Sequence, residues 1–132
     1  MKKARAPGLR VCLADEDPII RQVLASALEH LGHRVELCLN GGEVLEKAVP
    51  GAFDLLLIDL KMEAPDGIEV VGTLHRREVE TPTILMSNRF PAESWSTGLK
   101  YANVSLLLKP FSLETLERAI SDHRSFPGRT FR

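Results

Sequence analysis

The chain has 132 residues, a length typical of one domain that can bury a single hydrophobic core. Hydrophobic residues make up 44% and charged residues 27%, which excludes a disordered chain, and no apolar run approaches the ~20 residues that a membrane helix needs. The formal net charge is −1, but residues 11–122 contain 10 basic and 18 acidic groups, an acidic balance that argues against direct nucleic-acid binding.

Short apolar runs alternate along the chain with helical stripes. Five runs are predicted to be strands. In chain order they are residues 10–14, 35–39, 53–60, 83–87 and 104–108. The third run is apolar nearly throughout, which indicates a strand buried on both faces. The second alternates with polar residues and is therefore expected nearer an edge of the sheet.

The segments that follow the strands carry helix signals. Side-chain oxygens that can accept from the first free amides of a helix are predicted to act as caps at Asp17, Asn40, Asp66 and Ser112. The fourth helix is predicted over residues 91–102, with Trp95 on its inner face, and is the least regular of the five.

Five strands alternating with five helices predict an α/β fold with a parallel sheet covered on both faces, a three-layer α/β/α sandwich. The expected strand order is flavodoxin-like, 2-1-3-4-5. One domain is predicted at residues 10–124, between a basic leader at residues 1–9 and a C-terminal tail at residues 125–132. No apolar stretch of the signal-peptide kind follows the leader, so a cytoplasmic location is expected.

The two cysteines are predicted to be buried thiols. Cys12 and Cys38 each lie inside an apolar strand-like run, where a free cysteine behaves as a small hydrophobe. Neither their number nor their spacing indicates a disulfide framework or a zinc site.

Functional side chains follow four of the five predicted strands. In chain order they are Asp15 and Glu16, Asp59, Ser87, and Lys109. Parallel strands end at one edge of the sheet, about 4.8 Å apart, and ligands bind at that edge in open α/β sheets. Two carboxylates at ~5 Å repel by about 3 kcal/mol at an effective dielectric of ~20, which a hard cation such as Mg²⁺ would offset.

Taken together, these features closely resemble the receiver domain of two-component response regulators. The matching positions are residues 15–21, Asp59 followed by residues 65–67, Ser87, and residues 109–111. The resemblance covers about residues 10–123, and it implies the flavodoxin-like fold of the chemotaxis response regulators.

The resemblance also implies the chemistry. Asp59 would be the phosphoacceptor that attacks the phosphohistidine of a sensor histidine kinase or phosphotransfer protein. Lys109 would pair with a phosphoryl oxygen. Ser87 and Leu106 occupy the two positions whose side chains switch on phosphorylation in the family. The acyl phosphate would hydrolyse slowly, which makes the domain a switch with self-phosphatase activity rather than a conventional enzyme. Four oxygen donors would hold Mg²⁺: Glu16, Asp59, the backbone carbonyl of Lys61 and, through water, Asp15.

Four positions depart from the family pattern. Glu16 stands where aspartate is more common, Glu63 where proline is common, Asn88 where a small residue is usual, and Leu106 where an aromatic residue is common. The departures at Glu16, Asn88 and Leu106 motivate an alternative hypothesis, a phosphorylation-independent pseudo-receiver that acts as a protein-interaction module. Only about nine residues follow the last helix, so output is expected through a protein target or an effector domain outside this chain.

A third hypothesis is a small enzyme or flavin protein on the same fold. The acidic loop after the first strand contains no glycine-rich or serine-rich phosphate cradle, which argues against this hypothesis. A colourless purified protein would exclude the flavin version.

Overall fold

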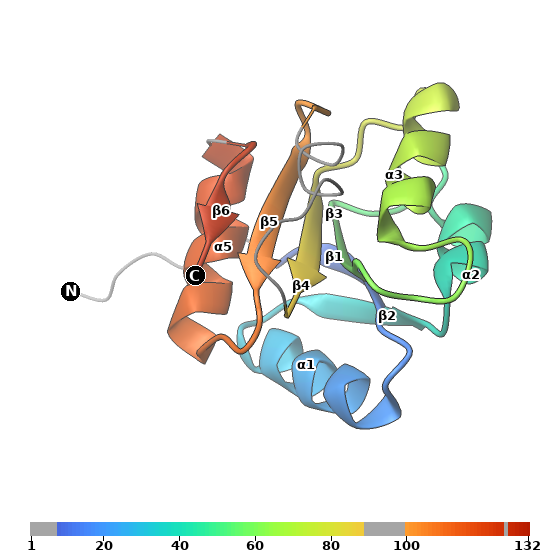
Figure 1. Cartoon of the computed structure of the whole chain (residues 1–132). Coiled ribbons are helices and arrows are strands. Elements are labelled where there is room, and N and C mark those ends of the chain that lie inside the picture. Colours follow the sequence, from blue (N-terminus) through green and yellow to red (C-terminus); the bar gives the residue numbers. More distant parts are fainter. Residues whose placement is uncertain (1–7, 89–99, 126) are drawn as a thin grey trace.

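The computed structural model describes residues 8–88, 100–125 and 127–132, in which a parallel sheet lies between two layers of helices (Figure 1). The strands are β1 Arg10–Ala14, β2 Arg34–Cys38, β3 Leu55–Asp59, β4 Thr83–Ser87, β5 Val104–Leu108 and β6 Thr130–Phe131. The described helices are α1 Pro18–His30, α2 Gly41–Lys47, α3 Gly67–Arg76 and α5 Leu113–Ser125.

The strand order is β2-β1-β3-β4-β5-β6, and every neighbouring pair is parallel. The predicted fold class and the order of the first five strands are confirmed, and β2 lies at an edge. The predicted fourth helix, with Trp95, falls largely on residues 89–99, outside the described residues.

Two hydrophobic clusters fill the two sides of the sheet. On one side, α1 and α5 cover side chains of the central strands, with Leu28 and Leu116 among those that are fully buried. On the other side, α2 and α3 contribute Val44 and Val70. Both clusters draw on β3, because alternate residues of this strand point to opposite faces. β3 is therefore a buried central strand, and its last residue, Asp59, is held firmly.

The predicted caps begin the helices as expected. The Asp17 carboxylate accepts from the amides of Ile19 and Ile20, and Ser112 accepts from the amide of Thr115. The sequence spacing of Asp66 and Glu69 forms a reciprocal capping box at the start of α3. The caps at Asp17 and Asp66 fix where α1 and α3 begin, directly beside the strand ends that carry the acidic groups.

The segment predicted to be a C-terminal tail contains a strand that the sequence analysis did not predict. In β6, Thr130 and Phe131 pair with Leu106 and Leu107 of β5, and Phe131 is buried in the core. The Ser105 hydroxyl accepts from two amides just before β6. A strand of two residues is too short to produce the alternation that reveals a strand in a sequence.

Cys12 and Cys38 are buried free thiols, as predicted, and their Sγ atoms lie 3.2 Å apart on β1 and β2. The hydrogen bond between them and their burial raise the pKa of Cys12, which keeps its thiol neutral. None of the described helices is long and apolar enough to cross a lipid bilayer.

Candidate functional site

The polar residues predicted to gather at one edge of the sheet follow adjacent strands. Asp15 comes directly after β1, Asp59 ends β3, Ser87 ends β4 and Lys109 comes directly after β5. Because β1, β3, β4 and β5 are consecutive parallel neighbours, their carboxyl ends meet at the same edge. The fold thus brings together side chains that are up to 94 positions apart in the sequence.

The Lys109 ammonium group joins two of the carboxylates. Its Nζ atom lies 2.9 Å from Asp15 Oδ2 and 3.4 Å from Asp59 Oδ1. The side chain of Asp15 is 2% exposed, that of Asp59 15% and that of Lys109 19%, so water screens these pairs less than it would at the surface. The single positive charge of Lys109 is therefore shared between the carboxylates of Asp15 and Asp59.

The pKa of Asp59 is raised above its ordinary value. Burial is the largest cause, because it disfavours the charged form, and the negative charge of Asp15 adds to it. The Lys109 ammonium and the backbone amide of Lys61 act in the opposite direction. The site therefore carries more negative charge than Lys109 alone compensates, and a further cation would relieve it.

The backbone around Asp15 is fixed by two contacts that the sequence analysis did not identify. The amide of Asp17 donates to Asp15 Oδ1 at 3.0 Å, and the Arg21 guanidinium donates to the Asp15 carbonyl at 2.7 Å. Arg21 lies in the first turns of α1, one helical turn after Pro18, and that position faces back toward the strand end. This spacing is the signal that could have identified it.

Glu16 does not share the Lys109 contact. Its side chain is exposed, and its Oε2 atom accepts a hydrogen bond from the backbone amide of Glu63 at 2.9 Å. Glu63 was noted only as a departure from the family pattern. Its contact with Glu16 joins the loop after β1 to the loop after β3.

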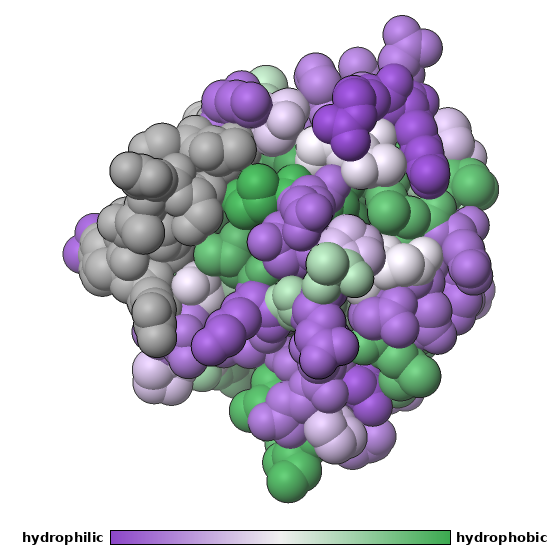
Figure 2. Space-filling view, turned by 45° about the vertical axis from the view of Figure 1, so that its right-hand side comes forward, coloured by the Kyte–Doolittle hydropathy of each residue, from purple (hydrophilic) through white to green (hydrophobic). Residues whose placement is uncertain are grey.

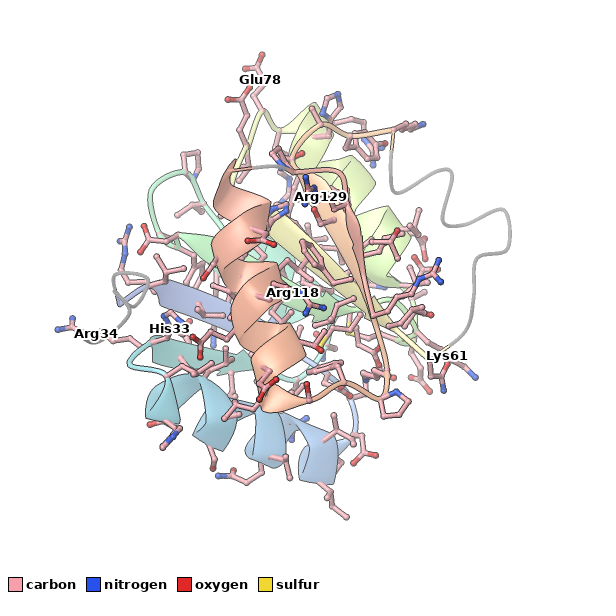
Figure 3. All side chains as sticks on the ribbon, turned by 90° about the vertical axis from the view of Figure 1, so that its left-hand side faces the viewer. His33, Arg34, Lys61, Glu78, Arg118 and Arg129 are labelled. Atoms are coloured by element: carbon pink, nitrogen blue, oxygen red, sulfur yellow. The ribbon has the colours of Figure 1, made fainter. Side chains whose placement is uncertain are left out.

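The remaining predicted residues lie around this cluster. Ser87 is nearly buried, and its carbonyl accepts from the Lys109 amide at 2.7 Å, which ties the ends of β4 and β5 together. Leu106 is 1% exposed and packs in the core cluster on the α2 and α3 side. The Lys61 side chain points outward at the molecular surface, as Figure 3 shows. Asn88 is exposed.

The donor chemistry at this edge fits a hard cation. The Lys109 ammonium group lies between two carboxylates, which shows that this edge can hold a cation. Within the described parts of the chain, no three His, Cys, Asp or Glu side chains converge as a ready-made metal centre. Mg²⁺ is usually bound by only one or two carboxylates and keeps several of its water ligands. A site with few converging carboxylates, such as Asp15 and Asp59, therefore suits Mg²⁺.

An apolar surface begins immediately beside the acidic edge. On α1, Ile19 is 73% exposed and Val23 61%, and their spacing of four residues places them on one face of the helix. At the start of α5, Leu113 is 43% exposed. Figure 2 shows apolar side chains among polar ones at the lower end of the molecule, where α1 lies.

The fold and the charged edge together define a class of protein, and comparison with known families agrees. The model of the response regulator receiver domain matches residues 11–121. The chain belongs to this family, and it is a receiver domain of the two-component response regulator type. The resemblance recognised in the sequence is thereby confirmed.

The chain is also similar to individual family members. It is 36% identical over 111 residues to the transcriptional activator protein PfeR of Pseudomonas aeruginosa, covering 84% of this chain and 36% of that protein. It thus spans about a third of that relative's length. Over 89% of this chain and 98% of the other, it superposes on a Francisella response regulator receiver domain with a TM-score of 0.80 and 28% identity. The regulator TrrA of Thermotoga maritima, solved in complex with Mg²⁺ and BeF, gives a TM-score of 0.76 at 25% identity, over 86% of this chain and 97% of TrrA.

Proposed function

We propose that this domain accepts a phosphoryl group on the Asp59 carboxylate and that phosphorylation switches its partner binding. The observation that carries the proposal is the Lys109 ammonium, which contacts both Asp59 and Asp15 at the carboxyl edge of the sheet. A partly buried carboxylate at the end of a rigid central strand, with a fixed cation beside it, is placed to act as a nucleophile.

In the transfer from a phosphohistidine, an Asp59 oxygen bonds to phosphorus while the phosphorus–nitrogen bond breaks. The departing imidazole keeps the electron pair of that bond and takes up a proton. Lys109 would then exchange a carboxylate contact for a phosphoryl oxygen, and the Ser87 hydroxyl would donate to another. Leu106, buried beside β4, would repack as the loop after Ser87 moves inward.

Magnesium is the cation that we assign to the site. Its donors would be Glu16, Asp59, the carbonyl of Lys61 and, through water, Asp15. When bound, Mg²⁺ would neutralise negative charge on the phosphoryl oxygens. The raised pKa of Asp59 is consistent with this assignment, because burial, its largest cause, and the nearby charge of Asp15 both disfavour the ionised carboxylate, and a bound cation would favour it.

The proposed phosphodonor is a sensor histidine kinase or a phosphotransfer protein in the cytoplasm. The apolar face of α1, with Ile19 and Val23, lies next to the acidic loop and offers a surface on which an apolar helix face of the donor can pack. The phosphorylated domain would then act on a downstream protein or on an effector domain outside this chain.

The test is a titration with Mg²⁺ and beryllofluoride, a phosphoryl mimic, followed by amide NMR, together with mass spectrometry after acetyl phosphate treatment. We expect shifts of the Ser87 and Lys109 amides and a mass gain of one phosphoryl group. Asp59→Ala should abolish both. Asp54→Asn is the matched control, because Asp54 binds Arg10 at the opposite edge of the sheet. No response at millimolar ligand, or a response that survives Asp59→Ala, would count against the proposal.

A second candidate function is a phosphorylation-independent interaction module. The observation that favours it is the Leu106 side chain, which is 1% exposed, packs in the core on the α2 and α3 side and has no ring that could change orientation on phosphorylation. This candidate predicts partner binding that is equal in wild type and Asp59→Ala, and a pull-down that compares the two distinguishes it from the phosphoacceptor.

A further inference from the structure

A single side-chain hydrogen bond connects the two loops that border Asp59. The amide of Glu63, in the loop between β3 and α3, donates to Glu16 Oε2 at 2.9 Å across 47 positions of sequence. Glu16 itself lies in the loop between β1 and α1. The bond crosses the acidic edge of the sheet at a point where neither loop has regular secondary structure.

The length of the glutamate side chain allows this bond. Shortening the side chain by one carbon–carbon bond, about 1.5 Å, would move an aspartate carboxylate out of hydrogen-bond range of the Glu63 amide. Asp15, the neighbouring acid, is already engaged by Lys109 and by the amide of Asp17. Glu16 is thus the acid of this loop that reaches across to the loop after β3.

The outer side of this bond is open to solvent. A cavity of about 480 Å³ lies beside it, lined by both glutamates and by Asn40 and Pro65 among others. A hydrated cation can therefore approach the Glu16 carboxylate from the outside. Because the amide occupies one carboxylate oxygen, the second oxygen remains for a cation.

We propose that the Glu63 amide is a positioning group, and that its bond to Glu16, the Glu16–Glu63 clasp, holds the Glu16 carboxylate in place for the divalent cation. The inference rests on the proposed function, because it concerns the same cation. A donor that fixes the orientation of a metal ligand typically changes metal affinity by 10-fold or more when it is removed. The clasp also means that the cation and the loop after β3 stabilise one another.

The first test concerns the clasp alone and uses cation-free protein. We expect the Glu63 amide proton to exchange with solvent about tenfold more slowly in wild type than in Glu16→Asp or Glu16→Ala, while the amides of β3 keep their protection. Equal exchange at Glu63 in wild type and Glu16→Asp would overturn the clasp.

The second test concerns the cation, with Mn²⁺ as the probe, by calorimetry and by the electron paramagnetic resonance signal of free Mn²⁺. Glu63→Pro and Glu63→Ala both lose the side-chain carboxylate, but only proline lacks the amide proton. We expect about tenfold weaker Mn²⁺ binding in Glu63→Pro than in Glu63→Ala. Amide spectra of β3 and β4 show whether the proline variant has kept its fold, and Glu16→Asp provides a variant with an unaltered backbone.

The failure of this inference can be distinguished from failure of the proposed function. Equal Mn²⁺ affinities of the two Glu63 variants, alongside normal wild-type binding, would overturn the positioning role of the amide alone. Wild-type protein that binds no Mn²⁺ at millimolar concentration would overturn the proposed cation site and the role of the clasp with it.

Discussion

Lys109 is the residue on which the charge balance of the acidic edge depends. Its ammonium group is the positive charge seen between Asp15 and Asp59, and Asp15 is almost completely buried. Removing one member of a buried ion pair costs more than the pair itself contributes, because the remaining charge is left without compensation. Lys109 is therefore important for the stability of the fold, apart from its proposed role in phosphoryl transfer.

We predict that Lys109→Met lowers the free energy of unfolding by about 3 kcal/mol at pH 7, measured by urea denaturation. The control is Lys47→Ala, because Lys47 forms an exposed ion pair with Glu36 at 3.6 Å and should contribute less than about 1 kcal/mol. Equal effects of the two substitutions would show that Asp15 is compensated by another group.

Asp59 has the opposite effect on stability. Its pKa is raised in the folded protein, so its ionised form destabilises the fold at every pH above that raised value. As the pH falls through the raised pKa toward the ordinary value of 3.8, the folded protein takes up the proton first and the penalty diminishes.

Asp59→Asn should accordingly stabilise the protein at pH 7, by about 1.4 kcal/mol for each unit by which folding raises the pKa of Asp59. The gain should shrink as the pH is lowered toward 4. Urea denaturation of both proteins at several pH values measures it. A gain that stays constant with pH would mean that the raised pKa of Asp59 is not its source.

At the scale of elements, local signals were sufficient for most of the sheet and for the helix starts. Residues 83–87 and 104–108 were predicted with the bounds that β4 and β5 have, because each run is apolar and bordered by turn residues. Asp66 and Glu69 are three residues apart, so their capping box depends on no distant contact. The sequence could not reveal β6, because its strand character comes from β5.

The C-terminal strand is anchored on three sides. Its backbone pairs with β5, the Arg132 carbonyl accepts from Arg118 at 3.3 Å, and the Ser105 hydroxyl accepts from the amides of Gly128 and Arg129. In Figure 3, Arg118 projects from α5, the helix nearest the viewer. β6 is therefore integrated into the domain, although the family match ends at residue 121.

We expect Phe131→Ala to reduce the free energy of unfolding by about 3 kcal/mol, because it leaves a cavity in the core between β5 and α5. Thr130→Ala alters an exposed side chain of the same strand and should change the unfolding free energy by less than about 0.5 kcal/mol. Thermal or urea denaturation measures both. A small effect of Phe131→Ala would mean that β6 detaches easily.

At the scale of the whole molecule, topology explains why the site could be predicted in outline. Strands 1, 3, 4 and 5 of a parallel sheet must end together, so Asp15, Asp59, Ser87 and Lys109 could be grouped without coordinates. The contacts between loops could not be predicted, because Glu16–Glu63 and Arg21–Asp15 depend on side-chain rotamers and loop paths. No periodic pattern encodes them.

Two buried histidines make the stability of the whole domain sensitive to acid. His33 Nδ1 accepts from the Leu9 amide, and burial lowers the pKa of His33. The Ser105 hydroxyl already accepts from two amides, so its own proton goes to His123 Nδ1, and burial lowers the pKa of His123 as well. Burial therefore favours the neutral form of both rings in the folded protein.

Below the ordinary histidine value of 6.5, the unfolded chain binds protons that the folded protein does not. Stability is present above that pH and is lost as the pH falls, by at most about 1.4 kcal/mol per pH unit for each histidine. We predict that the free energy of unfolding falls by about 1 to 2 kcal/mol between pH 7 and pH 5.5. Urea denaturation at several pH values measures this change. The variant with His33→Asn and His123→Asn should lose most of this dependence, and an unchanged slope would refute the assignment.

The register of the sheet has a practical consequence for following the switch. Asp59 pairs with Met86, Met86 with Leu107, and Leu107 with Phe131, so one transverse row runs from the proposed phosphoacceptor to the C-terminal strand. At ~4.8 Å per strand, the row places Phe131 about 14 Å from Asp59. A nitroxide spin label attached at position 132 would thus lie within range of paramagnetic relaxation at the edge that we propose is phosphorylated, away from the face of α1 on which we propose that the phosphodonor packs.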